Sequence, residues 1–122
     1  MQPEKAYAAE IKALQQERIA ALAEAAEYIL QQYKEGRIVF GTVVLAQADL
    51  VQARLDATDN PEERLALLEK QLQLAETALE CAKQRFDVGG TTKADVLQAK
   101  AHALDIKIKL LRERAGRTAA KK

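Results

Sequence analysis

Two glycine-containing reversals, 53 residues apart, constrain this chain more than any other feature of its sequence. At the second reversal a helical spacing of apolar residues stops, Gly89 and Gly90 follow, and Thr92 precedes a new helical spacing. Glycine tolerates the left-handed backbone that closes a helix, and threonine accepts a hydrogen bond from a free amide of the next helix. A weaker copy surrounds Gly36, which lies 53 positions before Gly89. We therefore predict one helical hairpin that is used twice.

The remaining apolar residues recur at steps of three and four, which is the spacing of an amphipathic α-helix. We predict an all-α fold of one domain, residues 1–122, built from two tandem antiparallel hairpins in an elongated four-helix bundle or a coiled-coil slab. Hairpin one is expected over residues 4–58 and hairpin two over 61–116, with a frayed tail at 117–122. Gly116 is expected to end the last helix.

The expected contact face of each helix follows from the same spacing. In the first helix it comprises Tyr7, Ile11, Leu14, Leu22, Ala25, Ile29 and Tyr33, interrupted by Arg18. Arg18 is expected either to pair with an acidic residue of a neighbouring helix or to extend its charged end to water. In the fourth helix it comprises Leu97, Ala101, Leu104, Ile108, Leu111 and Ala115. Further apolar rows, such as Leu67 with Leu74 and Ile19 with Leu30, exceed what one seam covers. We therefore expect a homo-oligomer.

The boundary between the hairpins has the clearest local signals. Asp59 or Asn60 is a suitable helix cap, and Pro61 suits the first helical position, where its missing amide costs nothing. A reversal this short places the flanking helices side by side and antiparallel. Both glycine reversals should then lie at one end of the molecule, with the termini and the Pro61 turn at the other. The second helix should be about ten residues shorter than the others.

The composition argues against several classes of function. Apolar residues make up 48% of the chain but aromatic residues only 4%, as in closely packed helices. With 19 basic and 18 acidic residues the net charge is +1, so no nucleic-acid partner is indicated. No stretch is apolar enough for a membrane span. The single cysteine, Cys81, permits no intrachain disulfide.

The hairpin tips resemble those of TolC-type outer-membrane efflux proteins, over roughly residues 18–115. The segments that carry the likeness are Arg85–Gly89 with Ala94–Lys100, and Tyr33–Arg37 with Val44–Ala48. That family also has the hairpin twice per chain, and its tips meet the helical hairpin of a periplasmic adaptor. Nothing in this chain resembles the membrane β-strands of the family.

The resemblance implies a partner-binding site at the tips. By position, the residues that would form it are Gly36, Arg37, Val88, Gly89, Gly90 and Thr91. The alternative is that these residues only close and cap helices, as every helix end requires. The resemblance also implies the periplasm or cell envelope if an export signal has been removed; otherwise the cytoplasm is expected.

Other candidate sites are weak. His102 has Asp105 and Asp95 on the same side of a helix, but a metal site needs more nitrogen or sulfur ligands, so we predict no metal. Cys81 lies in an apolar row and should be a small, buried side chain. The basic residues near the C-terminus suit the end of a helix dipole without any phosphate ligand. They are Lys107, Lys109, Arg112, Arg114, Arg117, Lys121 and Lys122.

No arrangement of residues supports catalysis or a cofactor, so we expect neither. The predicted function is a non-enzymatic helical interaction module that docks another helical hairpin or a second copy of itself. The alternative is a small cytosolic helical regulator or scaffold with no link to efflux.

Overall fold

The computed structural model of the protein describes residues 3–120 and is helical almost throughout. The helices are α1 Pro3–Ala6, α2 Ala8–Lys34, α3 Phe40–Asp56, α4 Pro61–Asp87 and α5 Lys93–Ala120. No strand occurs within residues 3–120. The all-α prediction is confirmed, and the β-branched and aromatic run at residues 38–40 forms the entry to α3 instead of a strand.

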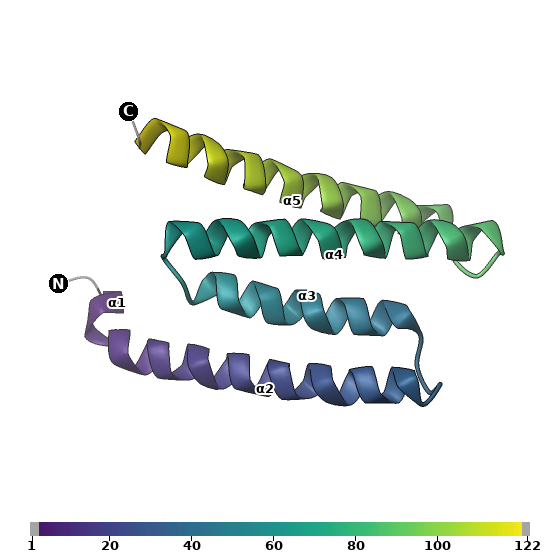
Figure 1. Cartoon of the computed structure of the whole chain (residues 1–122), viewed down its shortest axis with the longest axis horizontal. Coiled ribbons are helices and arrows are strands. Elements are labelled where there is room, and N and C mark those ends of the chain that lie inside the picture. The colour runs from purple at the N-terminus through teal and green to yellow at the C-terminus, as the bar shows by residue number, and fades with distance from the viewer. Residues whose placement is uncertain (1–2, 121–122) are drawn as a thin grey trace.

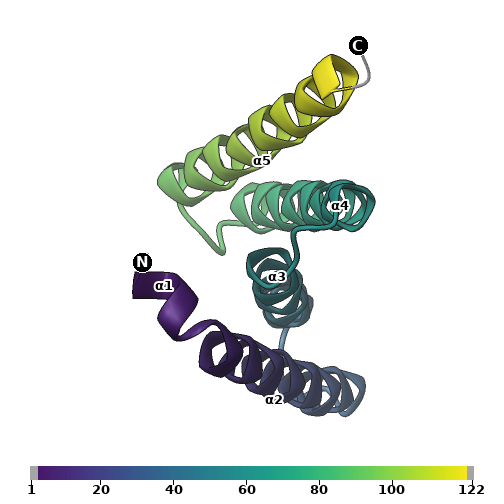
Figure 2. The same cartoon turned by 90° about the vertical axis from the view of Figure 1, so that its left-hand side faces the viewer.

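The four long helices form one open layer in the order α2, α3, α4, α5, each antiparallel to the next (Figure 1). Extensive contacts join only consecutive helices. The end-on view shows α2 and α5 at opposite edges of this layer (Figure 2). Of the two predicted arrangements, the structure therefore has the slab, because a closed bundle would bring α5 against α2.

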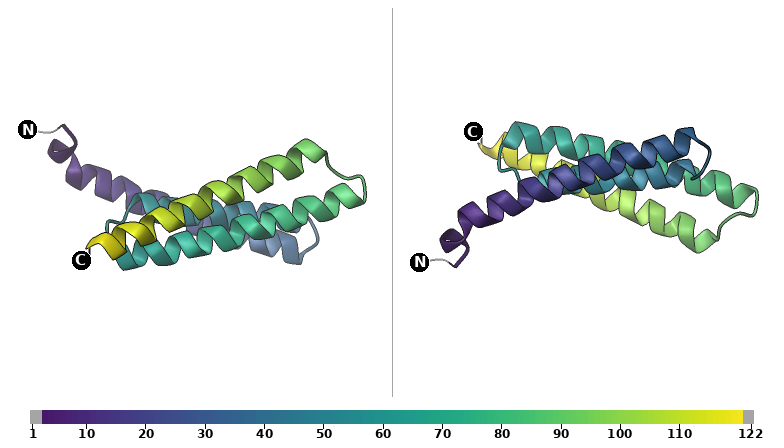
Figure 3. Two further views of the ribbon diagram at one scale, coloured as in Figure 1. Left: turned by 90° about the horizontal axis from the view of Figure 1, so that it is seen from above. Right: turned by 90° about the horizontal axis from the view of Figure 1, so that it is seen from below.

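The ends of the layer are arranged as the sequence predicts. Both glycine reversals lie at one end, and the start of α2 and the end of α5 lie with the Pro61 turn at the other (Figure 1). The α4–α5 tip extends beyond the α2–α3 tip, while the N-terminal part of α2 overhangs the opposite end (Figure 3). This offset arises because α3 has 17 residues, whereas α2 and α4 have 27 each.

Three helix boundaries differ from the prediction. The first helix is interrupted at Tyr7, which separates α1 from α2, and α3 ends at Asp56, two residues before Thr58. Gly116 does not end the last helix, because α5 continues to Ala120. An interior glycine destabilises a helix by only about 1 kcal/mol relative to alanine, so the helix can continue beyond it where the residues of the next turn favour helix formation.

The buried core lies mainly between α3, α4 and α5. Its largest cluster joins Val44, Val51 and Leu55 of α3 to Leu68 and Leu74 of α4 and Leu110 of α5. A second cluster contains Ala75, Ala103 and Ile106. Every residue of α2 remains at least partly exposed. Hairpin one is therefore held to the layer mainly through α3.

The predicted contact face of the last helix is wrong. Leu97, Leu104, Ile108 and Leu111 are each about half exposed, whereas Ala103, Ile106 and Leu110 are buried. The small side chain of Ala103 lets α5 approach α4 closely, and Ile106, which is only 1% exposed, fills the contact. The predicted row is more apolar, but it faces away from the partner helix.

The first helix shows a related difference. Of its predicted face, Tyr7 and Leu14 are 60% and 58% exposed, and Ile11, Leu22 and Ile29 are half-buried. The rows that suggested self-association, Leu67 with Leu74 and Ile19 with Leu30, are buried or half-buried within the chain. The oligomer prediction therefore loses its original basis, and the exposed apolar rows lie elsewhere.

Candidate functional site

The first tip, between α2 and α3, is closed by two nested backbone hydrogen bonds. Gly36 has a φ of 75° and donates from its amide to Tyr33 O at 3.0 Å, and Arg37 donates to Gln32 O at 2.9 Å. This is the Schellman arrangement, which satisfies the last carbonyl groups of a helix and favours glycine at the left-handed position. The predicted role of Gly36 in ending the helix is confirmed.

The second tip has the same geometry 53 positions later. Gly89 has a φ of 76° and donates to Phe86 O at 3.0 Å, and Gly90 donates to Arg85 O at 2.7 Å. Gly90 itself does not have a positive φ. Only the first glycine of the pair is therefore demanded by backbone conformation.

The tips differ where the next helix begins. The amide of Asp95 donates to Thr92 Oγ1 at 3.2 Å, and Thr91 Oγ1 donates to the Asp95 carboxylate. At the first tip Val39 occupies the position of Thr92, and α3 has no side-chain cap there. The predicted threonine cap is confirmed, and Asp95 reaches back to Thr91.

The six predicted partner-binding residues are presented at the same end of the molecule, on two separate tips. Val88 is 83% exposed, and the three glycines and Arg37 are also exposed, whereas Thr91 is half-buried. Arg37 Nε lies 3.2 Å from Glu35 Oε2. Next to the first tip the rings of Tyr33 and Phe40 are in contact, with their centroids 5.4 Å apart. These six residues thus offer backbone, one exposed valine and one paired arginine, and Val39 at the first tip is a second exposed valine, 64% exposed.

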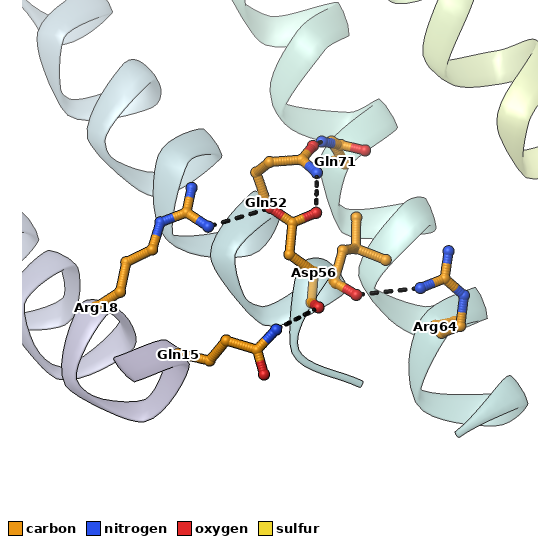
Figure 4. A network of polar contacts seen from close by, with 7 residues as sticks. Gln15, Arg18, Gln52, Asp56, Arg64 and Gln71 are labelled. Atoms are coloured by element: carbon orange, nitrogen blue, oxygen red, sulfur yellow. Dashed lines mark hydrogen bonds and ion pairs between the residues drawn. The ribbon is translucent and has the colours of Figure 1, made fainter. Parts of the chain in front are cut away.

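A polar network crosses the layer near the opposite end (Figure 4). Asp56 accepts hydrogen bonds from Arg18 Nη1 at 3.1 Å and from Gln52 Nε2 at 2.9 Å, and its backbone carbonyl accepts one from Gln15 Nε2 at 3.0 Å. Gln71 Nε2 donates to Gln52 Oε1 at 2.6 Å. The network joins α2, α3 and α4. Because each bond needs particular side chains to meet, the network sets the register between these helices.

Sequence reasoning identified only part of this network. The expected acidic partner of Arg18 is Asp56, but the roles of Gln15, Gln52 and Gln71 were not predicted. Gln71 is a buried polar residue, 8% exposed, within an otherwise apolar face. The signal that could have revealed the bond between Gln71 and Gln52 is the presence of a glutamine within a row of apolar contact residues.

Arg64 is a second structural residue that the sequence analysis missed. Its Nη1 donates to Leu55 O at 3.1 Å and to Thr58 O at 3.2 Å, and its Nε lies 3.3 Å from Glu113 Oε1. The side chain thus satisfies carbonyl groups at the end of α3 and joins that end to α5. Its place four residues after the Asn60 cap was the available signal.

An open groove of about 1060 Å³ lies beside Arg64, between the ends of α3, α4 and α5. Its walls are rich in charge, and most of the charges pair within the chain. Arg64 pairs with Glu113, and Arg117 lies 3.7 Å from Glu62 across the α4–α5 contact. Arg112 also lines the groove and forms no ion pair within the described residues.

Two further basic residues of α5 form ion pairs, whereas Lys107 and Arg112 form none within the described residues. Lys109 lies 3.1 Å from Asp105, and Arg114 lies 3.2 Å from Glu69 of α4. Lys121 and Lys122 lie outside the described residues. The pairing agrees with a structural role for this end of α5, and the absence of a nucleic-acid partner stays a prediction.

The single histidine and the single cysteine of the chain, His102 and Cys81, lie on different helices. His102 is exposed on α5, and its neighbour Asp105 pairs with Lys109. Cys81 is a free, half-buried thiol on α4, less buried than predicted. Across the described part of the chain, no group of three or more His, Cys, Asp or Glu residues is placed to hold a metal ion.

Two negative findings complete the description. Among the described helices, none combines the length and the apolar character needed to cross a membrane. No protein-family model, curated protein or solved structure matches the chain.

Proposed function

We propose that this protein is a non-enzymatic helical interaction module whose two glycine-closed tips dock the helical hairpin of another protein. The observation that carries the proposal is the placement of both tips at one end, closed by the same two hydrogen bonds. Two tips on one layer can grip a partner at two points, which raises the affinity beyond that of either contact alone.

The chemistry of the tips suits a helical partner. Val88 is 83% exposed, and its apolar side chain would be covered by a partner's apolar face. The glycines leave open space around the backbone, since a Cβ placed on Gly36 or Gly89 would meet nothing within 4 Å. A helix could therefore approach the backbone of both tips closely, as small residues permit at helix contacts.

The comparison with TolC-type tips rests on the sequence motif. In that comparison the partner is the hairpin of an adaptor-like protein. The first tip departs from the motif at Val39, where no side-chain cap forms. We therefore assign the larger share of partner contact to the second tip, which also extends farther from the layer (Figure 3).

A photo-crosslinking amino acid placed at Val88 tests the proposal in the cells that make the protein. The expected result is a covalent adduct with one helical-hairpin protein, identified by mass spectrometry. A matched probe at Glu76, exposed in the middle of α4, should give no such adduct. Identical adducts from both positions, or none from the tip, would contradict the proposal.

A further inference from the structure

The two edges of the layer carry apolar rows that nothing in the chain covers. The α5 row consists of Leu97, Ala101, Leu104 and Ile108, and all four residues are exposed. The α2 row consists of Leu14, Arg18, Ala21 and Ala25, all exposed, followed one turn later by Tyr28, which is 67% exposed. Neither row is explained by the tips, so the inference drawn from them goes beyond the proposed function.

The two hairpins are related by a constant offset in sequence. Pro61, the start of α4, lies 53 positions after Ala8, the start of α2, and Asp87, the end of α4, lies 53 positions after Lys34, the end of α2. Lys93, the start of α5, lies 53 positions after Phe40, the start of α3. In this alignment α5 is the equivalent of α3, and α2 is the equivalent of α4. The contact between α3 and α4 therefore corresponds to a contact between α5 and α2.

The contact between α3 and α4 shows what these rows do when they are covered. Its residues on α3 are Val44, Ala48, Val51 and Leu55, and they belong to the main core cluster. Each lies 53 positions before one residue of the α5 row. On the α4 side the corresponding residues are Leu67, Gln71, Leu74 and Ala78, each 53 positions after one residue of the α2 row. The exposed rows are thus the positional equivalents of a contact that the chain already makes.

Charge agrees with the same alignment. The hydrogen bond between Gln52 and Gln71 at the α3–α4 contact translates into Asp105 opposite Arg18. The two side chains are of opposite sign and about half exposed, and within one chain Arg18 pairs with Asp56 and Asp105 with Lys109. On either side of Asp105 and Arg18, and within one residue of the same antiparallel register, Lys107 is level with Glu17 and Lys100 with Glu24. Opposite charges at matched positions set register and partner choice more than affinity.

We propose that the α5 row of one copy packs against the α2 row of a second copy, so that this chain associates head to tail. Each edge is thus covered by the opposite edge of an identical chain. The reason is that α5 is the equivalent of α3, and the α2 row is the equivalent of the α4 surface on which α3 already packs. Such a contact is heterologous, so it leaves one free edge on each end of a dimer and either closes into a ring or extends.

Two edge variants test this by complementation. The α5 variant carries Leu104→Asp and Ile108→Asp, and the α2 variant carries Leu14→Asp and Tyr28→Asp. All four positions are at least 48% exposed in a single chain, so helicity by circular dichroism should be retained. Leu45→Asp is the matched control, because Leu45 is a 64% exposed leucine of α3 outside both rows.

The masses of the species in solution, measured by light scattering and native mass spectrometry, give the result. The unchanged chain and the control should associate, and each edge variant alone should be a monomer. An equimolar mixture of the two variants should form a one-to-one dimer, through the α5 row left intact in one and the α2 row left intact in the other.

Three outcomes would overturn the proposal. The first is a monomeric unchanged chain at millimolar concentration. The second is self-association of one edge variant but not the other, which would mean that one row pairs with itself. The third is a mixture that stays monomeric. A Val88→Asp variant, with the crosslinking amino acid moved to the exposed neighbour Asp87, separates this proposal from that of the tips, because it should lose partner adducts while associating normally.

Discussion

The two hairpins share the geometry of their reversals and differ in how they are buried. Both tips have glycine at a φ near 75° and the same pair of closing hydrogen bonds. Yet α3 is the most buried of the long helices, while its partner α2 has no fully buried residue. A reversal is thus determined by a few local residues, whereas burial depends on position in the layer.

Position in the layer explains the difference. The helices α3 and α4 each have two neighbours, and α2 and α5 have one each. Apolar rows related by 53 positions are therefore buried in α3 and exposed in α5. Similar apolar rows therefore differ in how much they stabilise the fold, because the chain supplies a partner helix for the α3 row and none for the α5 row.

The largest expected effect tests whether the hairpins contribute unequally to stability. Replacing Ile106, which is 1% exposed, by alanine should lower the free energy of unfolding by about 2–4 kcal/mol, because it leaves a cavity between α4 and α5. Leu22→Ala in half-buried α2 should cost less than half as much. Urea unfolding followed by circular dichroism measures both. Equal losses would show that hairpin one is held as firmly as hairpin two.

The next effect tests whether the two reversals are equivalent. Gly36→Ala and Gly89→Ala should each cost about 1–2 kcal/mol, because an L-residue is strained at positive φ. Gly90→Ala is the control, since Gly90 lacks a positive φ, and it should change stability by less than about 0.5 kcal/mol. Thermal unfolding gives the comparison. A difference between Gly36 and Gly89 as large as either loss would break the equivalence.

The smallest effect concerns the caps, where the reversals differ. Thr92→Ala should cost about 1 kcal/mol, because it removes the hydroxyl that accepts from the Asp95 amide. Val39→Thr should stabilise the first hairpin by a similar amount, since it supplies the missing cap. Melting temperatures of the two variants should therefore move in opposite directions. No gain from Val39→Thr would mean that the side chain of residue 39 already contributes in another way.

Much of the fold could be predicted from local signals. Gly36, Gly89 and Asn60 act through bonds to residues only two to five positions away, so the sequence contains both partners of each bond. The short Pro61 turn then makes neighbouring helices antiparallel. The tips could be placed at one end for the same reason.

The candidate surfaces could be predicted less well. The spacing of Leu104 and Ile108 is that of a contact face, and it predicted a contact with the partner helix within the chain. The amphipathic pattern states which residues favour burial, but it does not state what buries them. Ala103 was overlooked because a small side chain has little hydrophobic weight, although it permits the closest approach.

The sequence by itself determined how the chain reverses, where most of the helices begin and end, and which rows of side chains are apolar, because these properties depend on residues a few positions apart. Only the tertiary structure decided that the helices form an open layer, that Gln71 bonds to Gln52 across it, and that the α5 row faces outward. Those outcomes depend on which of several compatible faces meet, and that choice is made by packing between helices distant in sequence.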